Sequence, residues 1–312
     1  WDPGTRIVLE ANTEWWDAGY PKFKELSFLF LPVEKQVGGL LNGAVDIVTE
    51  LPGTDTLRVM KSGVARIVKK ESFYTMGSSW NCRAGPLSDK RVRQAINHAL
   101  NKDELVRYDL LGNGRPLATL TMDGEAGHDA SLLPYPYDPD KARRLLKEAG
   151  YPNGFHLKAL VKVQGLRTMR IIAKQLSRIG VVVDVESTTD TAAVRDMSKK
   201  AWDWIFAGCP DAMSHSVFVQ FIFLSSLSPF SVTGDPVYDR MLAEMVNTID
   251  EQTQLKRGRE LDRYVYEQAL SLFTYQRIKT YGVRNGVRFI PYITGMPYFY
   301  LSRWEDHAAV PR

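Results

Sequence analysis

Apolar and polar residues follow two different periods along the first third of the chain. Short apolar runs bounded by turn residues predict strands at 6–12, 25–32, 65–72 and 74–82. Residues 34–48 carry an amphipathic helix into an Asn-Gly turn and a further strand. Two helices are expected within 87–114, the first capped by Ser88 and the second by Asn101 with Glu104 in a capping box. This part of the chain is therefore predicted to be α/β.

The segment PYPYDPDKARRLLKEAGYPNGF, residues 134–155, is the most sharply punctuated in the sequence. Asp138 stands at the N-cap position, and Pro139 occupies the first helical position, where no amide hydrogen is needed. Gly150 follows the last residue of the pattern and is expected to end the helix. The apolar positions that share one helical face are Ala142, Leu145, Leu146 and Ala149.

Strands and helices continue to alternate in the second half. After a strand at 155–163, a helix at 165–180 leads into a strand at 181–188, and a helix at 191–201 leads into one at 202–209. This order predicts crossover units in a mixed or parallel sheet. The remaining expectations are an irregular stretch at 211–223, helices at 235–249 and 251–270, and strand-like segments from 271 to 300. The polar connection at 115–133 is a candidate crossing between lobes.

Composition and charge exclude several classes of protein. The chain has 312 residues, of which 44% are hydrophobic and 24% charged, as in globular proteins, and no apolar run has the length of a membrane span. A net charge of +4 without a block of five or six basic residues argues against nucleic acid as a partner. The two cysteines have no histidine at metal-ligand spacing, and the sequence contains neither GxSxG nor HExxH, so no metal, cofactor or enzymatic activity is expected.

Five segments in order carry a resemblance to a known family. They are PGTRIVLEANTEWW, LLNGAVDIVTELP, GPLSDKRVRQAINHALNKDEL, PYPYDPDKARRLLKEAGYPNGF and IIAKQLSRIGVVVDVES. Together with the closing VRNGVRFIPYITGMPYFYLSRW, they resemble the extracytoplasmic solute-binding proteins of peptide and nickel ABC transporters, known as family 5. The resemblance covers nearly the whole chain and corresponds to the carboxy-terminal portion of such proteins.

The resemblance implies an α/β, two-lobed clamp of the periplasmic-binding-protein type, class II, with mixed sheets and an incomplete first lobe. Residues 1–115 and 273–312 would belong to the first lobe and residues 116–272 to the second. The implied function is capture of a peptide or similar small solute for an ABC importer, outside the cytoplasm. Permease subunits would be the partners, and a missing anchor or a partner would provide any membrane contact. The alternative is the solute-sensing domain of a signalling or transcriptional regulator.

The resemblance also nominates a ligand-binding residue. In peptide-binding members, an Asp pairs with the ammonium end of the ligand, and the matching segment here ends at Asp211. An equally open interpretation is that Asp211 only caps the turn that follows it. Gly208 stands where the family often has Trp, and Ser214 and Ser216 stand where it often has acids. An altered pocket is therefore expected, with its aromatic wall lost or supplied from elsewhere.

Other candidates lie at predicted strand ends. Trp80 could stack on a ligand, and Asn81 could form hydrogen bonds with the backbone of the ligand. The alternative for Trp80 is a structural residue of the core. Cys82 and Cys209 are expected to be free, mostly buried thiols near the cleft. His215 follows Cys209 by six residues, yet the third member of a nucleophilic or metal site is not recognisable, so a solvated loop His is the alternative to a ligand contact.

Overall fold

The computed structural model describes residues 1–189, 202–296 and 298–305. The chain forms two compact units, one from residues 1–72 and 278–312 and the other from residues 73–277. Two strands, β4 (Ala65–Trp80) and β9 (Tyr275–Arg284), each run from one unit into the other. The chain therefore leaves the first unit and returns to it through extended backbone.

The first unit has short elements around two apolar clusters. Its other strands and helices are β1 (Arg6–Glu10), β2 (Glu25–Leu29), α1 (Val33–Asn42), β3 (Ile47–Val48), α2 (Thr56–Lys61), β10 (Val287–Arg288) and β11 (Arg303–Trp304). β1 pairs antiparallel with β2, and β3 pairs antiparallel with β9. One cluster joins the helices to β3 through residues such as Leu40, Val48 and Val59, and the other is aromatic and includes Tyr281 and Phe289.

The second unit is built on a mixed sheet. Its strand order is β9-β4-β8-β6-β7, where the new members are β6 (Phe155–Lys162), β7 (Val181–Thr188) and β8 (Trp204–Pro210). β8 pairs antiparallel with β4 but parallel with β6, and β6 pairs parallel with β7. The short β5 (Gly114–Pro116) pairs with β9. The predicted mixed sheet with crossover units is thus confirmed.

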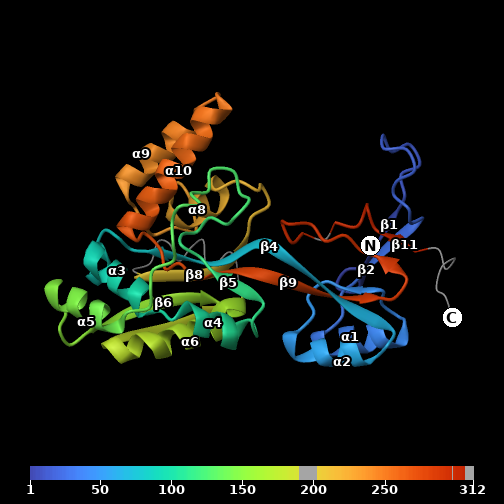
Figure 1. The fold of residues 1–312 in the computed structure, drawn as a ribbon, viewed down its shortest axis with the longest axis horizontal. Coiled ribbons are helices and arrows are strands. Elements are labelled where there is room, and N and C mark those ends of the chain that lie inside the picture. The colour runs from blue at the N-terminus through green and yellow to red at the C-terminus, as the bar shows by residue number, and fades with distance from the viewer. Residues whose placement is uncertain (190–201, 297, 306–312) are drawn as a thin grey trace. The chain divides into compact units, whose positions relative to one another are not determined.

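Helices cover both faces of this sheet (Figure 1). On one face lie α3 (Lys90–Ala99), α4 (Lys102–Asp109), α5 (Pro139–Glu148) and α6 (Leu166–Leu176). They pack on alternate, fully buried strand residues, among them Trp80, Leu157, Ala159, Trp204 and Phe206. On the other face lie α8 (Val217–Leu224), α9 (Pro236–Val246) and α10 (Glu251–Gln268). Alternation along the strands supplies an apolar surface to both helical layers.

The punctuated segment forms the expected helix. The Asp138 carboxylate accepts the Lys141 amide at 2.8 Å, and Pro139 is the first residue of α5. Gly150 has a φ of 91°, a left-handed conformation that L side chains rarely adopt. Asn101 caps α4 through the Glu104 amide at 2.9 Å, also as predicted.

Three local expectations are wrong. Asp89, and not Ser88, caps α3, because its carboxylate accepts the Arg91 amide at 2.8 Å. The two strands predicted at 65–72 and 74–82 are the single strand β4. The stretch at 211–223 contains α8, whose sequence VFVQFIFL is apolar except for Gln220 and has no amphipathic period to indicate a helix. The helix predicted at 191–201 lies outside the described residues.

The connection at 115–133 lies within the second unit. Several of its side chains are buried, including Thr119 and Thr121 at 0% exposure. The compact units divide at 72/73 and 277/278, whereas the lobe boundaries expected from the resemblance lie near 115 and 272. The lobe assignment itself stays a prediction. Among the described residues, no helix is both long enough and apolar enough to cross a membrane.

Gly77 of β4 offers a test of how α8 packs on the sheet. A Cβ added there would lie 2.1 Å from the Phe223 ring, so Gly77→Ala should force α8 away from the strand. We expect the free energy of unfolding to fall by about 1–3 kcal/mol, as for other overpacked cores, with partial rescue by Phe223→Leu. Gly38→Ala in α1, where nothing lies within 4 Å, is the control and should not destabilise the protein. Urea denaturation measures all three, and equal loss with and without Phe223→Leu would contradict this packing.

Candidate functional site

Asp211 is buried at the end of β8. Its amide donates to the Phe73 carbonyl at 2.7 Å, which continues the pairing of β8 with β4. The side chain is 0% exposed, and its two carboxylate oxygens accept the backbone amides of Met213 at 2.7 Å and His215 at 2.9 Å. Asp211 therefore caps the turn that follows it, and its contact with a ligand stays a prediction. Since each carboxylate oxygen can accept two hydrogen bonds, capping leaves acceptor capacity for a ligand.

A second carboxyl group, that of Glu125, lies within hydrogen-bonding reach of Asp211. Glu125 is 5% exposed, and its Oε2 accepts the Met122 amide at 2.8 Å. Its Oε1 is buried and accepts no hydrogen bond from the described residues. We refer to these two groups, Glu125 and Asp211, as the carboxyl pair.

Burial determines the protonation of the carboxyl pair. Loss of solvation raises the pKa of Glu125 to about 10, and the hydrogen bond and negative charge of Asp211 act in the same direction. Two ionised carboxylates are both acceptors and cannot bond to each other, whereas a protonated Glu125 can donate to Asp211. At neutral pH the pair therefore holds one proton and one negative charge.

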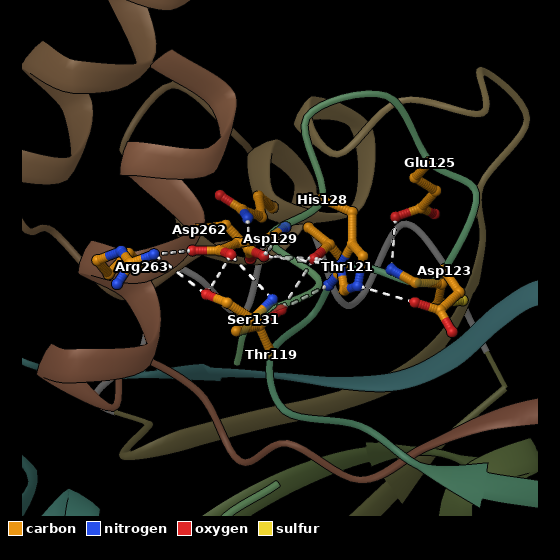
Figure 2. A network of polar contacts seen from close by, with 11 residues as sticks. Thr119, Thr121, Asp123, Glu125, His128, Asp129, Ser131, Asp262 and Arg263 are labelled. Atoms are coloured by element: carbon orange, nitrogen blue, oxygen red, sulfur yellow. Dashed lines mark hydrogen bonds and ion pairs between the residues drawn. The ribbon is translucent and has the colours of Figure 1, made fainter. Parts of the chain in front are cut away.

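A polar network fixes the segment that carries Glu125 (Figure 2). The centre of the network is Asp262 of α10, which is 0% exposed. Its Oδ2 accepts the Thr121 hydroxyl at 2.7 Å and the Asp129 amide at 3.1 Å, and its Oδ1 accepts the Gln220 amide group at 3.0 Å. His128 completes the network by bridging the Thr121 hydroxyl, at 2.8 Å from Nδ1, and the Asp123 carboxylate, at 3.0 Å from Nε2. Both sides of Glu125 are thereby attached to the second unit.

Backbone contacts bring Glu125 to the turn after Asp211. Ala126 donates its amide to the Ser214 carbonyl at 3.0 Å and accepts the Ser216 amide at 2.9 Å, forming a parallel bridge with His215. Ser214 has a φ of 55°, a left-handed conformation that the turn requires. Two loops distant in sequence are thus joined at the carboxyl pair.

Cys209 and Gly208 lie beside the carboxyl pair on β8. Burial raises the pKa of the Cys209 thiol to about 12, and the charges of Asp211 and Glu125 add to the shift. This thiol is therefore protonated at neutral pH and is a poor nucleophile. A Cβ at Gly208 would lie 1.8 Å from the Tyr74 hydroxyl, so Tyr74 of β4 occupies the space that a larger side chain would need. Tyr74 packs against the cluster that includes Met76 and Trp80, on the face of the sheet opposite Cys209, so it does not line the carboxyl pair. The expected change in the aromatic wall stays a prediction.

His215 contributes to the turn through its backbone and ring. Its amide bonds Asp211, and its Nδ1 accepts the Val217 amide at 3.2 Å. Its role as a ligand contact stays a prediction.

Trp80 and Asn81 lie at the other end of the strand pair. In the antiparallel register Tyr74 faces Pro210 while Trp80 faces Trp204, which separates Trp80 from the Asp211 end by about 20 Å at 3.3 Å per residue. Trp80 is 0% exposed and packs against Trp204 with ring centroids 5.8 Å apart. This environment favours the core interpretation of Trp80.

Asn81 is half-buried, and its side-chain oxygen accepts the Arg83 amide at 3.2 Å. The ligand contacts expected of Trp80 and Asn81 stay predictions. Cys82 and Cys209 are both free. Within the described ranges, no three His, Cys, Asp or Glu side chains are placed to hold a metal ion.

The structure adds Glu125 to the residues considered from sequence. Glu125 is a single acid in a polar loop, and its contact with Asp211 depends on the long-range pairing of two loops. No local signal in the sequence points to it.

The sequence matches a family model over residues 1–227, that of the bacterial extracellular solute-binding proteins, family 5 Middle. The chain belongs to this family. It is 29% identical over 189 residues to the glutathione-binding protein GsiB of Pectobacterium atrosepticum, a match that covers 59% of this chain and 37% of that protein. The match thus spans well under half of the relative's length. The family is one of solute-binding proteins rather than enzymes.

Solved structures show the same fold. The periplasmic binding protein DppA from Helicobacter pylori, in complex with the peptide STSA, has a TM-score of 0.82 at 19% identity, covering 98% of this chain and 62% of that one. AgaA from A. tumefaciens R10, in complex with agropinic acid, has a TM-score of 0.78 at 22% identity, covering 98% and 66%. The chain therefore has the α/β fold of the two-lobed periplasmic binding proteins, as the sequence predicted.

Glu125 should make stability depend on pH. Its pKa is about 10 in the folded chain and about 4.3 in an unfolded one, so between these values the folded state binds one more proton. The stabilisation that protonated Glu125 provides is complete below the unfolded pKa of about 4.3. It is lost as pH rises towards the folded pKa of about 10. Relative to Glu125→Gln, the parent should lose up to about 1.4 kcal/mol of unfolding free energy per pH unit.

Urea denaturation between pH 5.5 and 8.5 measures this difference. Gln can donate to Asp211 and accept from Met122, so the variant preserves the contacts of a protonated Glu. Glu148→Gln, on the exposed side of α5, is the control and should follow the parent. Parallel curves for the parent and Glu125→Gln would show that Glu125 has an ordinary pKa.

Proposed function

We propose that this chain is part of the substrate-binding component of an ABC importer. It captures a peptide or a similar small solute that carries an ammonium group, and Asp211 is the contact for that group. The observation that carries the proposal is a buried carboxyl pair with no cationic partner among the described residues. An ammonium ion is the complement that such a site lacks, because a buried charge needs a partner.

The surroundings of the carboxyl pair also suit an amino group. Asp211 is held by two backbone amides, so its oxygens keep their position when a ligand arrives. Residues adjacent in sequence to the pair, Gly124 and Ala212, are exposed and give an approach to it.

Named relatives and structures support a solute with an amino group. GsiB is named a glutathione-binding protein, and DppA from Helicobacter pylori was solved with a tetrapeptide. A dipeptide-binding protein from Pseudoalteromonas sp. SM9913, solved with Met-Leu, has the same fold at a TM-score of 0.74 and 16% identity. Glutathione and Met-Leu are therefore suitable first probes.

The family description supports a location outside the cytoplasm. DppA from Helicobacter pylori is described as associated with an ABC transporter, which supports delivery to permease subunits of such a transporter. In this proposal the two strands that join the units, β4 and β9, are the connections between lobes. Any membrane contact would come from an anchor or a partner. The sensing alternative has no support in the comparisons.

Ligand binding to the complete polypeptide tests the proposal. A ligand at a hundred times its Kd should add about 2.7 kcal/mol to the unfolding free energy, seen as a raised Tm. Asp211→Asn should weaken glutathione and Met-Leu by about 30-fold to several thousand-fold, the effect of removing one partner of a buried charge pair. Asp184→Asn, on the exposed part of β7, is the matched control and should leave the Kd unchanged.

N-acetylated forms of the same two probes test the contact from the ligand side. They lack the ammonium group and should bind as weakly to the parent as the free-amine forms bind to Asp211→Asn. The comparison does not depend on the folding of a variant. Equal affinity for acetylated and free forms would remove Asp211 from the ammonium site.

A further inference from the structure

We propose that an ammonium-bearing ligand displaces the proton held between Glu125 and Asp211, so that each capture event releases one proton. This inference rests on the proposed function, because it needs a ligand ammonium group at Asp211. It assigns Glu125 as a second carboxylate of the site and makes affinity depend on pH.

The geometry leaves one place for a positive charge. Asp211 receives two backbone amides and Glu125 receives one, and these four oxygens have no Lys or Arg partner among the described residues. Glu125 Oε1 is buried without a donor. The carboxylate oxygens of Glu125 and Asp211 are both acceptors, so in the absence of ligand they can form a hydrogen bond with each other only if one of them carries a proton. The proton thus occupies the position where a donor from the ligand would bind.

Glu125 cannot avoid this competition by rotating into solvent with its loop. Residues on both sides of it are attached, through Ala126 to the turn after Asp211 and through Thr121 and His128 to Asp262. The fixed backbone keeps Glu125 beside Asp211 in both states. When a ligand binds, Glu125 must therefore either stay protonated beside it or lose its proton.

The other ionisable groups around the pair are few. The charge of Asp262 raises the pKa of Glu125, and Cys209 carries a protonated thiol. The Nδ1 atom of His215 accepts the Val217 amide. His128 lies between Asp123 and Asp262. The surroundings therefore favour a proton on Glu125 when the site is empty, and they favour ionisation when a cation replaces that proton.

The step balances in charge and atoms. The empty site holds one proton and one negative charge, and the ligand brings an ammonium ion with its own three N–H donors. On binding, the Glu125 O–H bond breaks and its proton goes to solvent, while both carboxylates accept N–H bonds from the ammonium. The occupied site has two negative charges and one positive charge, and no further reactant is needed.

Calorimetry of the complete polypeptide counts the released protons. Titrations with Met-Leu and with glutathione in two buffers of different ionisation heat, near pH 6.5, should give one proton released per ligand. Between pH 5.5 and 7 the affinity should rise about tenfold per pH unit, because the ligand amine, with a pKa of about 7.7–8.0 or above, is still protonated there. Glu125→Gln should release none and should lose this pH dependence.

The outcomes separate this inference from the function on which it rests. Two results would overturn the role of Glu125 and leave the ammonium contact intact. One is tight, Asp211-dependent binding with no proton release, and the other is equal proton release from Glu125→Gln and the parent. N-acetyl-Met-Leu binding as tightly as Met-Leu would overturn the ammonium contact, and the proton exchange with it. If none of the probes binds, both proposals fail for these ligands.

Discussion

A carboxylate buried without a cation must be compensated, and this constraint governs the site. At Asp211 the compensation comes from two backbone amides and from the proton of Glu125. Asp211 keeps its place because β8 pairs with β4 up to Pro210. Glu125 keeps its place because the network around Asp262 holds its loop. The position of the proton between Glu125 and Asp211 thus depends on both the strand pairing and the polar network.

The same arrangement explains why the site is rigid and yet contains a carboxyl oxygen without a hydrogen-bond donor. Asp262 accepts hydrogen bonds from Thr121 and Gln220, and these contacts hold the loop. Glu125 Oε1 is one of several buried polar atoms that have no hydrogen-bond partner among the described residues. A binding site benefits from such preorganisation, since the ligand does not have to order the groups that it contacts.

Sequence reasoning succeeded where the signal is local. Asp138, Pro139 and Gly150 define α5 because caps and positive φ angles depend on near neighbours. It failed at α8, whose residues are apolar except for Gln220 and have no amphipathic period, and at Ser88, where the adjacent Asp89 is the better acceptor. Asp211 could be nominated by a match to a family, but Glu125 could not, because its role arises from loop pairing between distant segments.

The central claim is that Glu125 holds a proton in the empty protein and loses it to a ligand. Infrared difference spectroscopy at neutral pH, before and after addition of Met-Leu, tests it directly through the carbonyl band of a protonated carboxyl group. We expect the ligand to remove this carboxyl band from the parent and to add a carboxylate band. Glu125→Gln should show neither change. A ligand-saturated parent with an unchanged carboxyl band, or without that band before ligand is added, would contradict it.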